Sequence, residues 1–395
     1  MDLRKAYLDH IAATPLRPEV LEAMLPFFRG SYGNPQSLHS AGQEALQAVD
    51  EARAKVAGLI GAASEEIVFT AAGSESNNLA LKGMALANQV RGKRIVVSAI
   101  EHASVLNSAK ALEKLGFTTV FVPVDRFGRI DPGDVRKALT KDTVLVSIMT
   151  ANSEVGTIEP VAEIVRICRE NGVLVHTDSV AAAGAVPVDV KALGVDALSL
   201  AADQFYGPKG AAALFVRKGV RVLPLIDGGV QEGGRRGGTE NVPAIVGMGK
   251  AAEIAAAGVG QRAAAAKTLR DLLIRELLFR ADNVVLTGHP ELRLPHHASF
   301  CVEFIEGEGM LLHLDMKGVA CSSGSACTSK SLKASHVLLA MGLDHALAQG
   351  SLVFSLLETT AREDIDYVLE VFPPIIDKLR RMSPLYTKYL EEKEP

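Results

Sequence analysis

Four polar residues of this chain follow short apolar segments, at positions where their side chains could do chemistry. Ser74 precedes a predicted helix, where free backbone N–H groups favour a phosphate, although a serine there can also cap the helix. Asp178 ends another such segment, where its carboxylate could hold a pyridinium nitrogen or cap the next turn. His102 and Gln204 follow two more. A glutamine amide is not nucleophilic, so Gln204 cannot capture an aldehyde covalently.

Apolar segments alternate with helical patterns from residue 66 onward. Each segment is short and continuously apolar, as strands buried on both faces are. The alternation predicts an α/β fold with a mostly parallel sheet between helices. Ligands of such sheets bind beyond the carboxyl ends of the strands, which is where the four polar residues stand. The predicted strands are residues 66–70, 94–98, 119–122, 144–149, 173–176 and 196–200.

The pattern changes beyond about residue 255, where shorter strands alternate with helices that differ more in length. This stretch predicts a smaller α+β domain that also includes the first residues of the chain. The predicted domains are therefore a large one at 15–255 and a small one made of 1–14 and 256–395. The predicted elements of the small domain are helices at 256–280, 307–315, 335–341 and 362–382 and strands at 283–286 and 299–304.

The composition bears on the partners of the protein and on its location in the cell. The 395 residues carry a formal net charge of −4, which gives no reason to expect nucleic acid or an anionic membrane as partner. The N-terminus has no apolar signal core, and no apolar run approaches the roughly 18–20 residues of a membrane span. The 4 cysteines form no CxxC pair, which favours a reducing, cytoplasmic setting.

Of the cysteines, Cys327 is the candidate for chemistry. It stands in a small, polar loop at 322–329, which suits an exposed nucleophilic thiol, or it is a leftover cysteine. Cys321 could pair with it or share a metal, although the apolar residues before Cys321 favour burial. Cys168 lies in a helical pattern and Cys301 in a strand, and both are expected in the core.

Motifs along nearly the whole chain resemble the cysteine desulfurases of the NifS/IscS type, class V aminotransferases of PLP fold type I. That resemblance implies a homodimer with the active site at the subunit boundary. The motifs are Tyr7-Leu8-Asp9, Gly33-Asn34-Pro35, Glu75-Ser76-Asn77-Asn78-Leu79, Glu101-His102, Glu154-Val155-Gly156, His176-Thr177-Asp178, Tyr206-Gly207-Pro208-Lys209-Gly210 and Ser322-Ser323-Gly324-Ser325-Ala326-Cys327.

The resemblance implies a role for five of the residues present. His102 would stack on the cofactor ring and handle protons, and Asp178 would bind the pyridinium nitrogen. Ser74 would bind the phosphate, and Thr239 would reach the phosphate of the other subunit. Cys327 would take sulfur from cysteine and carry it as a persulfide.

The departures from the family pattern concern the same pocket. Gln204 stands where the Schiff-base lysine is expected, and Glu358 where an arginine grips the substrate carboxylate. An anion at 358 would repel substrate cysteine. Lys209 is no substitute, because the family has a lysine there as well as the catalytic one. The other departures are Ser153 for an asparagine, Ala181 for a glutamine, Ala201 for a phosphate-binding serine, Asp203 for a histidine and Leu357 for a glycine.

Three functions are compatible with this pattern. The first is a sulfur-relay or iron–sulfur cluster assembly protein in which Cys327 carries a persulfide, or ligates a cluster shared with an IscU-like scaffold. PLP is then absent or non-covalently bound. The second is an active desulfurase-type enzyme that holds PLP non-covalently through Asp178, His102, Ser74 and Thr239. The third is a different acid/base activity, or a site for a cationic ligand, in a pocket formed by Asp203, Glu358, His102 and Asp178.

Overall fold

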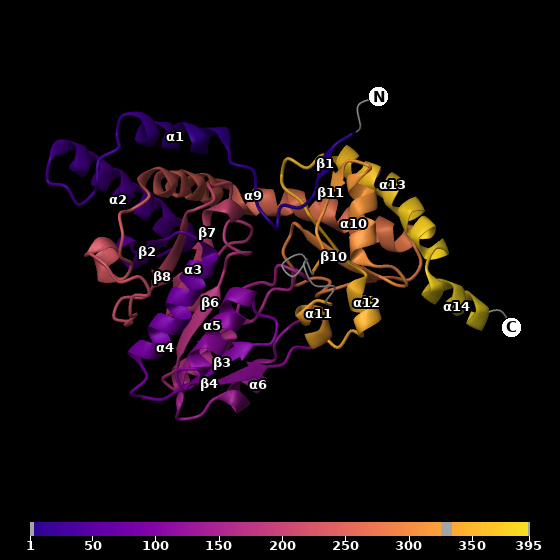
Figure 1. Ribbon diagram of the computed structural model, residues 1–395, viewed down its shortest axis with the longest axis horizontal. Helices are drawn as coiled ribbons and strands as arrows, with labels where there is room; N and C mark the ends of the chain where they lie inside the picture. Colours follow the sequence, from indigo (N-terminus) through magenta and orange to yellow (C-terminus); the bar gives the residue numbers. More distant parts are fainter. Residues whose placement is uncertain (1–3, 325–333, 394–395) are drawn as a thin grey trace.

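A seven-stranded sheet forms the centre of the larger lobe (Figure 1). The computed structural model describes residues 4–324 and 334–393. All neighbouring strands pair in parallel except β8, which is antiparallel to both of its neighbours. The mostly parallel sheet is therefore confirmed. Its order is β2 (Ile67–Thr70), β8 (Ala212–Val216), β7 (Ala197–Ala201), β6 (Leu174–Asp178), β5 (Thr143–Ser147), β3 (Arg94–Ser98) and β4 (Thr118–Val122).

Strand β8 was not predicted from the sequence, and its direction follows from its connection. Only a turn that includes the short helix η3 (Ala202–Gln204) separates it from β7, and a connection of that length joins antiparallel neighbours. Parallel strands need longer crossovers, which the remaining strands have in the form of helices.

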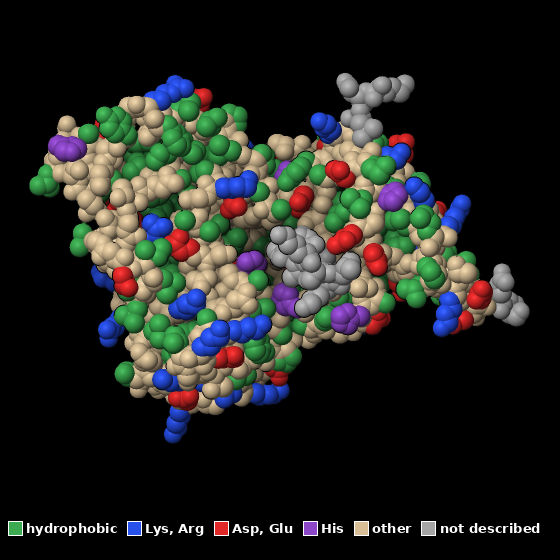
Figure 2. All heavy atoms as spheres, in the orientation of Figure 1, with side chains coloured by type: hydrophobic (Ala, Val, Ile, Leu, Met, Phe, Trp, Pro, Cys, Tyr) green, Lys and Arg blue, Asp and Glu red, His purple; other side chains and the backbone are tan. Residues whose placement is uncertain are grey.

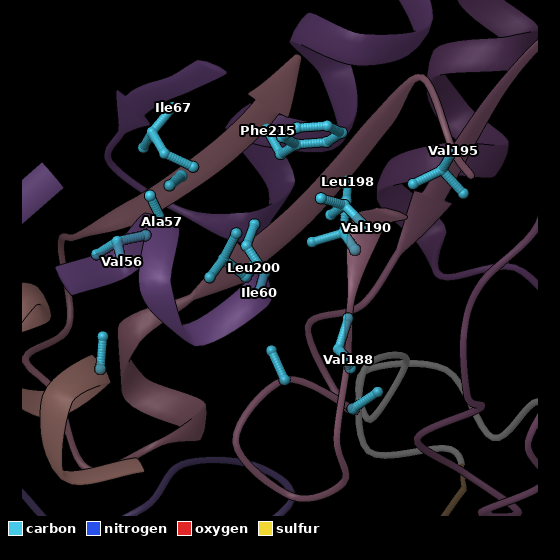
Figure 3. Close-up of a cluster of buried hydrophobic side chains, with 14 of the residues drawn as sticks. Val56, Ala57, Ile60, Ile67, Val188, Val190, Val195, Leu198, Leu200 and Phe215 are labelled. Carbon is cyan, nitrogen blue, oxygen red and sulfur yellow. The ribbon is translucent and has the colours of Figure 1, made fainter. Parts of the chain in front are cut away.

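Helices cover the sheet and bury apolar side chains against it (Figure 3). Val56 and Ile60 of α2 pack with Ile67 of β2, Leu198 of β7 and Phe215 of β8. Helix α3 passes through a π-helical turn, η2, into α4. The helices of this lobe are α1 (Pro18–Arg29), α2 (Ser40–Ile60), α3 (Gly73–Asn78), η2 (Leu79–Gly83), α4 (Met84–Ala87), α5 (Ala103–Glu113), α6 (Pro132–Ala138), α7 (Val161–Glu170) and α8 (Val190–Leu193).

The second lobe combines two small sheets with helices. In one, β10 (His297–Val302) pairs antiparallel with β9 (Val284–Leu286) and β12 (Ser351–Ser355). In the other, β1 (Ala6–Tyr7) runs parallel to β11 (Val319–Ala320), so the N-terminal segment joins this lobe. Strand β10 begins and ends two residues before the predicted strand, and α14 was not predicted. The helices are α10 (Gly307–Asp315), α11 (His336–Ala340), α12 (His345–Gln349), α13 (Arg362–Arg381) and α14 (Pro384–Lys393).

Helix α9 (Val242–Arg280) connects the two lobes (Figure 1). It begins well before the predicted start at 256, and Gly258 interrupts it with a non-helical φ of −151°. By length and composition alone it could cross a membrane, contrary to the expectation from the sequence. Half of its most apolar window is buried, and it packs along α1 and α2, as a core helix does.

Two large clusters of buried apolar residues lie mainly in one lobe each, and a smaller cluster joins the lobes through residues such as Ile100, Met149 and Cys301. One large cluster contains residues from α2, β2, β7 and the first half of α9, whereas another contains Ala6, Leu8, Leu273, Phe300 and Phe354. The predicted domains, 15–255 and 1–14 with 256–395, remain a proposal, which this grouping and the interruption at Gly258 support. On the face in Figure 2, acidic and basic side chains are interspersed and a hollow lies between the lobes.

A buried ion pair fixes the loop that leads to Thr239. The Glu232 carboxylate accepts hydrogen bonds from Arg53 Nη1 at 2.7 Å and Nη2 at 2.8 Å, and from the Phe69 N–H at 2.8 Å. The Glu232 side chain is only 2% exposed, and its backbone adopts a φ of 50°. The pairing holds this left-handed loop against α2 and β2.

Replacing Glu232 by alanine is expected to lower the free energy of unfolding by about 3 kcal/mol, because it leaves the Arg53 guanidinium and the Phe69 N–H without their acceptor. Urea denaturation at pH 7 measures the change. Glu170→Ala, which breaks the exposed pair with Arg136, is the control and should change stability by less than about 0.5 kcal/mol. Equal effects in both variants would contradict the structural role of Glu232.

Candidate functional site

Asp178 ends β6 with its carboxylate buried and fully oriented by neighbours. Oδ1 accepts from the Val180 N–H at 2.9 Å, and Oδ2 accepts from Asn77 Nδ2 at 2.6 Å. Burial raises the pKa of Asp178, while these hydrogen bonds and the charge of His102 oppose the rise. Burial disfavours the ionised carboxylate, and a nearby positive charge would stabilise it. Asp178 could therefore receive a cationic ring nitrogen.

A chain of hydrogen bonds links Asp178 to His102. The Asn77 amide that donates to Asp178 also donates to Ser104 Oγ at 2.9 Å, and Ser104 Oγ lies 2.7 Å from His102 Nδ1. The Ser104 N–H donates to the same Nδ1 at 3.1 Å, so a neutral His102 carries its proton at Nε2. Asp178 and His102 were predicted as site residues from the sequence, whereas Asn77 and Ser104 were given no role. Their hydrogen bonds form only because the fold brings the ends of α3 and α5 together.

Ser74 is the second residue of α3, and the N-cap position is Ala72. The alternative that Ser74 caps the helix is therefore wrong. An acidic side chain already lies at this helix start: Glu75 Oε2 accepts from the Ala71 N–H at 2.8 Å, and its Oε1 accepts from Arg236 Nε at 2.9 Å. Thr239 lines a cavity with Arg236 and Ala71 beside that start. The proposed phosphate roles of Ser74 and Thr239 stay predictions.

The turn after β7 is bound to the N-terminal segment. Thr14 Oγ1 donates to the Asp203 carbonyl at 2.9 Å and accepts from the Tyr206 N–H at 2.7 Å. Gln204 Nε2 donates to the Ile11 carbonyl at 3.2 Å. The amide of Gln204 thus faces a backbone acceptor. Burial raises the pKa of Asp203, and Lys209 opposes the rise.

A cavity lies beside this turn, between the two lobes. His10 is 8% exposed, its Nδ1 has no hydrogen-bond partner among the described residues, and burial lowers its pKa to about 4. None of the lining residues within 4–324 and 334–393 is a lysine. The lining residues are His10, Thr14, Ala181, Gly184, Ala185, Gln204, Tyr206, Arg262, Ala263, Ala266, Pro295, His296, Leu356, Leu357 and Glu358.

Glu358 is the acidic residue of this cavity, and its charge is paired. Its carboxylate forms an ion pair with Arg17 and accepts a hydrogen bond from the Tyr206 hydroxyl. The predicted repulsion of substrate cysteine by Glu358 stays a prediction, and the ion pair with Arg17 would weaken such a repulsion. The proposed acidic pocket is not assembled, since Asp203, His102 and Asp178 do not line the cavity with Glu358.

Cys327 lies outside the described residues. The described residues on either side of its segment meet at Glu154: Ser335 Oγ donates to the Glu154 carboxylate, and a Cβ added to Gly324 would lie 3.0 Å from its Oε2. Cys168 and Cys301 are buried as predicted, and burial raises both pKa values to about 12. Cys321 is partly exposed as a residue, but burial of its thiol raises the pKa of that thiol well above its usual value. Residues 4–324 and 334–393 contain no cluster of three metal-ligating side chains.

The residues present fit PLP at one end and not at the other. Asp178 offers the buried carboxylate that a pyridinium nitrogen requires. At the aldehyde end, Gln204 has no nucleophile, and its amide is bonded to the N-terminal segment. The described residues therefore do not fit a PLP held as a Schiff base at position 204.

Comparisons with known proteins agree on one family. The model of the aminotransferase class-V family matches residues 6–368. The chain is 51% identical to "Cysteine desulfurase IscS" of Dictyoglomus turgidum, over 96% of this chain and 97% of that protein. It is 49% identical to "Cysteine desulfurase IscS" of Methanosarcina thermophila, over 98% and 95%. A solved "NIFS-like protein" superposes with a TM-score of 0.89 at 38% identity, over 95% of this chain and all of that one.

Glu154 makes stability depend on pH, because burial raises its pKa from 4.5 to about 7. Between these values the folded protein holds a proton that the unfolded chain has released, so the contribution of Glu154 to stability falls as pH rises from about 4.5 to 7. We expect the free energy of unfolding of Glu154→Gln, relative to that of wild type, to rise by about 1–2 kcal/mol between pH 5 and pH 8. This value is reduced because Glu154 is partly exposed and solvent screens its charge. Urea unfolding at both pH values measures this difference. A constant difference would contradict the raised pKa.

Proposed function

The chain belongs to the aminotransferase class-V family, and we propose that it transfers sulfur through Cys327, in iron–sulfur cluster assembly, without holding PLP as a Schiff base. Its similarity to proteins named cysteine desulfurase supports the sulfur chemistry. PLP is the cofactor expected of this family. The observation that carries the rest of the proposal is Gln204, whose amide hydrogen-bonds to the Ile11 carbonyl at the position the family resemblance gives to the lysine.

In this function the sulfur reaches Cys327 already in the sulfane state. The Cys327 thiolate attacks the terminal sulfur of a donor persulfide, forming a new S–S bond while the donor leaves as its thiolate. A thiolate of the acceptor then attacks the outer sulfur, and Cys327 leaves as a thiolate. Neither exchange consumes an oxidant or reductant, and neither requires the C–S bond of cysteine to break.

The partners of this function are a second copy of the chain and an acceptor such as an IscU-like scaffold. Cys327, one thiol per chain, could also ligate a cluster that the scaffold shares. The interspersed surface charges of Figure 2 favour neither nucleic acid nor an anionic membrane as partner. A cytoplasmic setting fits the absence of paired cysteines from the sequence.

A second candidate is an enzyme that holds PLP without a covalent bond. The observation that favours it is the buried Asp178 carboxylate, which is oriented by Val180 and Asn77. Asp178 would bind the ring nitrogen, and Ser104 would hold the Nε2–H form of His102. The two candidates differ in whether the purified protein retains PLP and whether it releases sulfide from cysteine.

The first prediction concerns PLP. Wild-type protein incubated with PLP and then desalted is expected to keep no near-visible absorbance band, to gain no PLP mass after borohydride reduction, and to release no sulfide from L-cysteine. The IscS of Dictyoglomus turgidum, treated in parallel, serves as the positive control. A retained band with sulfide release but no reducible adduct would support non-covalent PLP. A reducible adduct would contradict both candidates.

The second prediction concerns Cys327. Protein loaded with a low-molecular-weight persulfide should pass sulfane sulfur to a dithiol acceptor, and Cys327→Ser should reduce this transfer at least about tenfold because the variant lacks the attacking thiolate. Cys321→Ser is the matched variant and should retain transfer, since burial holds the pKa of the Cys321 thiol well above its usual value. Undiminished transfer by Cys327→Ser would refute the proposed role. A loss shared by both variants would show that the two cysteines cooperate.

A further inference from the structure

Tyr206 and Glu358, which line the interlobe cavity, form a carboxylate-binding arrangement together with Arg17. The Glu358 carboxylate is contacted from one side by the Arg17 guanidinium and from the other by the Tyr206 hydroxyl. Because the acceptor is a carboxylate, both contacts are charge-assisted hydrogen bonds. The side chains of Arg17 and Glu358 are 29% and 19% exposed, so water screens their interaction only in part.

The two donors are held in place without help from Glu358. The Arg17 guanidinium lies over the Tyr206 ring, with Cζ 4.6 Å from the ring centroid, and the Arg17 N–H donates to the Tyr206 carbonyl at 3.3 Å. Thr14 fixes the Tyr206 backbone from the other side. Arg17 and Tyr206 are therefore positioned in advance for a carboxylate, which lowers the ordering cost of binding one.

Glu358, by contrast, comes from the other lobe. It lies three residues beyond β12, far along the chain from both donors. Arg262 also lines the cavity, and its charge opposes the rise that burial and Glu358 cause in the pKa of Tyr206. Without Glu358, the described lining residues of the cavity would include the Arg262 guanidinium and no carboxylate, and Arg17 would lose its carboxylate partner.

We propose that Arg17 and Tyr206 form a carboxylate clamp that the chain fills with its own Glu358. While Glu358 occupies the clamp, the cavity excludes ligands that carry a carboxylate, free amino acids among them. When the side chain at 358 is shortened, the clamp takes small monocarboxylates from solution. This specificity depends on neither PLP nor Cys327, and it goes beyond the proposed function.

Binding of propionate to protein prepared without PLP tests the proposal. By isothermal titration calorimetry, Glu358→Ala is expected to bind propionate with a Kd at least about tenfold lower than wild type, a difference of about 1.4 kcal/mol. Glu358→Gln is the matched variant: its amide oxygen still fills the clamp, so it should bind propionate no better than wild type. Propionamide, which lacks the charge, should bind none of the three proteins.

The double variant Arg17→Ala/Glu358→Ala identifies the clamp. It should lose the gained affinity, because the guanidinium that holds the carboxylate is gone. Glu170→Ala, at the exposed pair with Arg136, should behave as wild type. If Glu358→Ala does not fold, Glu358→Ser carries the same expectation. The proposal is overturned if wild type binds propionate as tightly as the shortened variants, or if the gain persists without Arg17.

Discussion

The hydrogen bonds of Thr14 hold the candidate site together. Its hydroxyl donates to the Asp203 carbonyl and accepts from the Tyr206 N–H, and its own N–H donates to the same carbonyl at 2.8 Å. These groups are buried or nearly so, and unpaired they would each cost about 1–3 kcal/mol. The pairing fixes the turn after β7 in an unusual backbone, with Tyr206 at a φ of 70°. The orientations of Gln204, Tyr206 and Arg17 all depend on it.

Two polar networks share the region between the lobes but differ in chemistry. One runs from Asp178 through Asn77 and Ser104 to His102, and couples a buried acid to an imidazole at the carboxyl edge of the sheet. The other pairs Glu358, which lines the cavity, with Arg17 of the other lobe. The first network presents a buried, oriented carboxylate that could receive a cationic ring nitrogen, whereas the second pairs an acidic residue with a cation from the other lobe.

The sequence predicted the elements whose signal is local. Buried strands such as β5 and β6 are short apolar segments, and their order with the helices implies the parallel sheet. Strand β8 was missed although Ala212–Val216 is a short apolar segment of the same kind, and its antiparallel direction depends on the turn before it. Of the site, Asp178 and Gln204 were recognised from strand ends and motifs. The Arg17–Glu358 pair could not be, since no local pattern relates charges from the two ends of a chain.

The pairing of β1 with β11, in register Ala6 with Val319, has a consequence for how the molecule is made. During synthesis, β1 leaves the ribosome long before β11, the strand with which it pairs. The N-terminal segment must therefore wait, unpaired, through most of synthesis, while the central sheet can already fold. Contacts of such large sequence separation form slowly, because the intervening chain must first be confined. The interlobe cavity is completed late, when Glu358 leaves the ribosome. The central sheet of a nascent chain can therefore form before its interlobe cavity does.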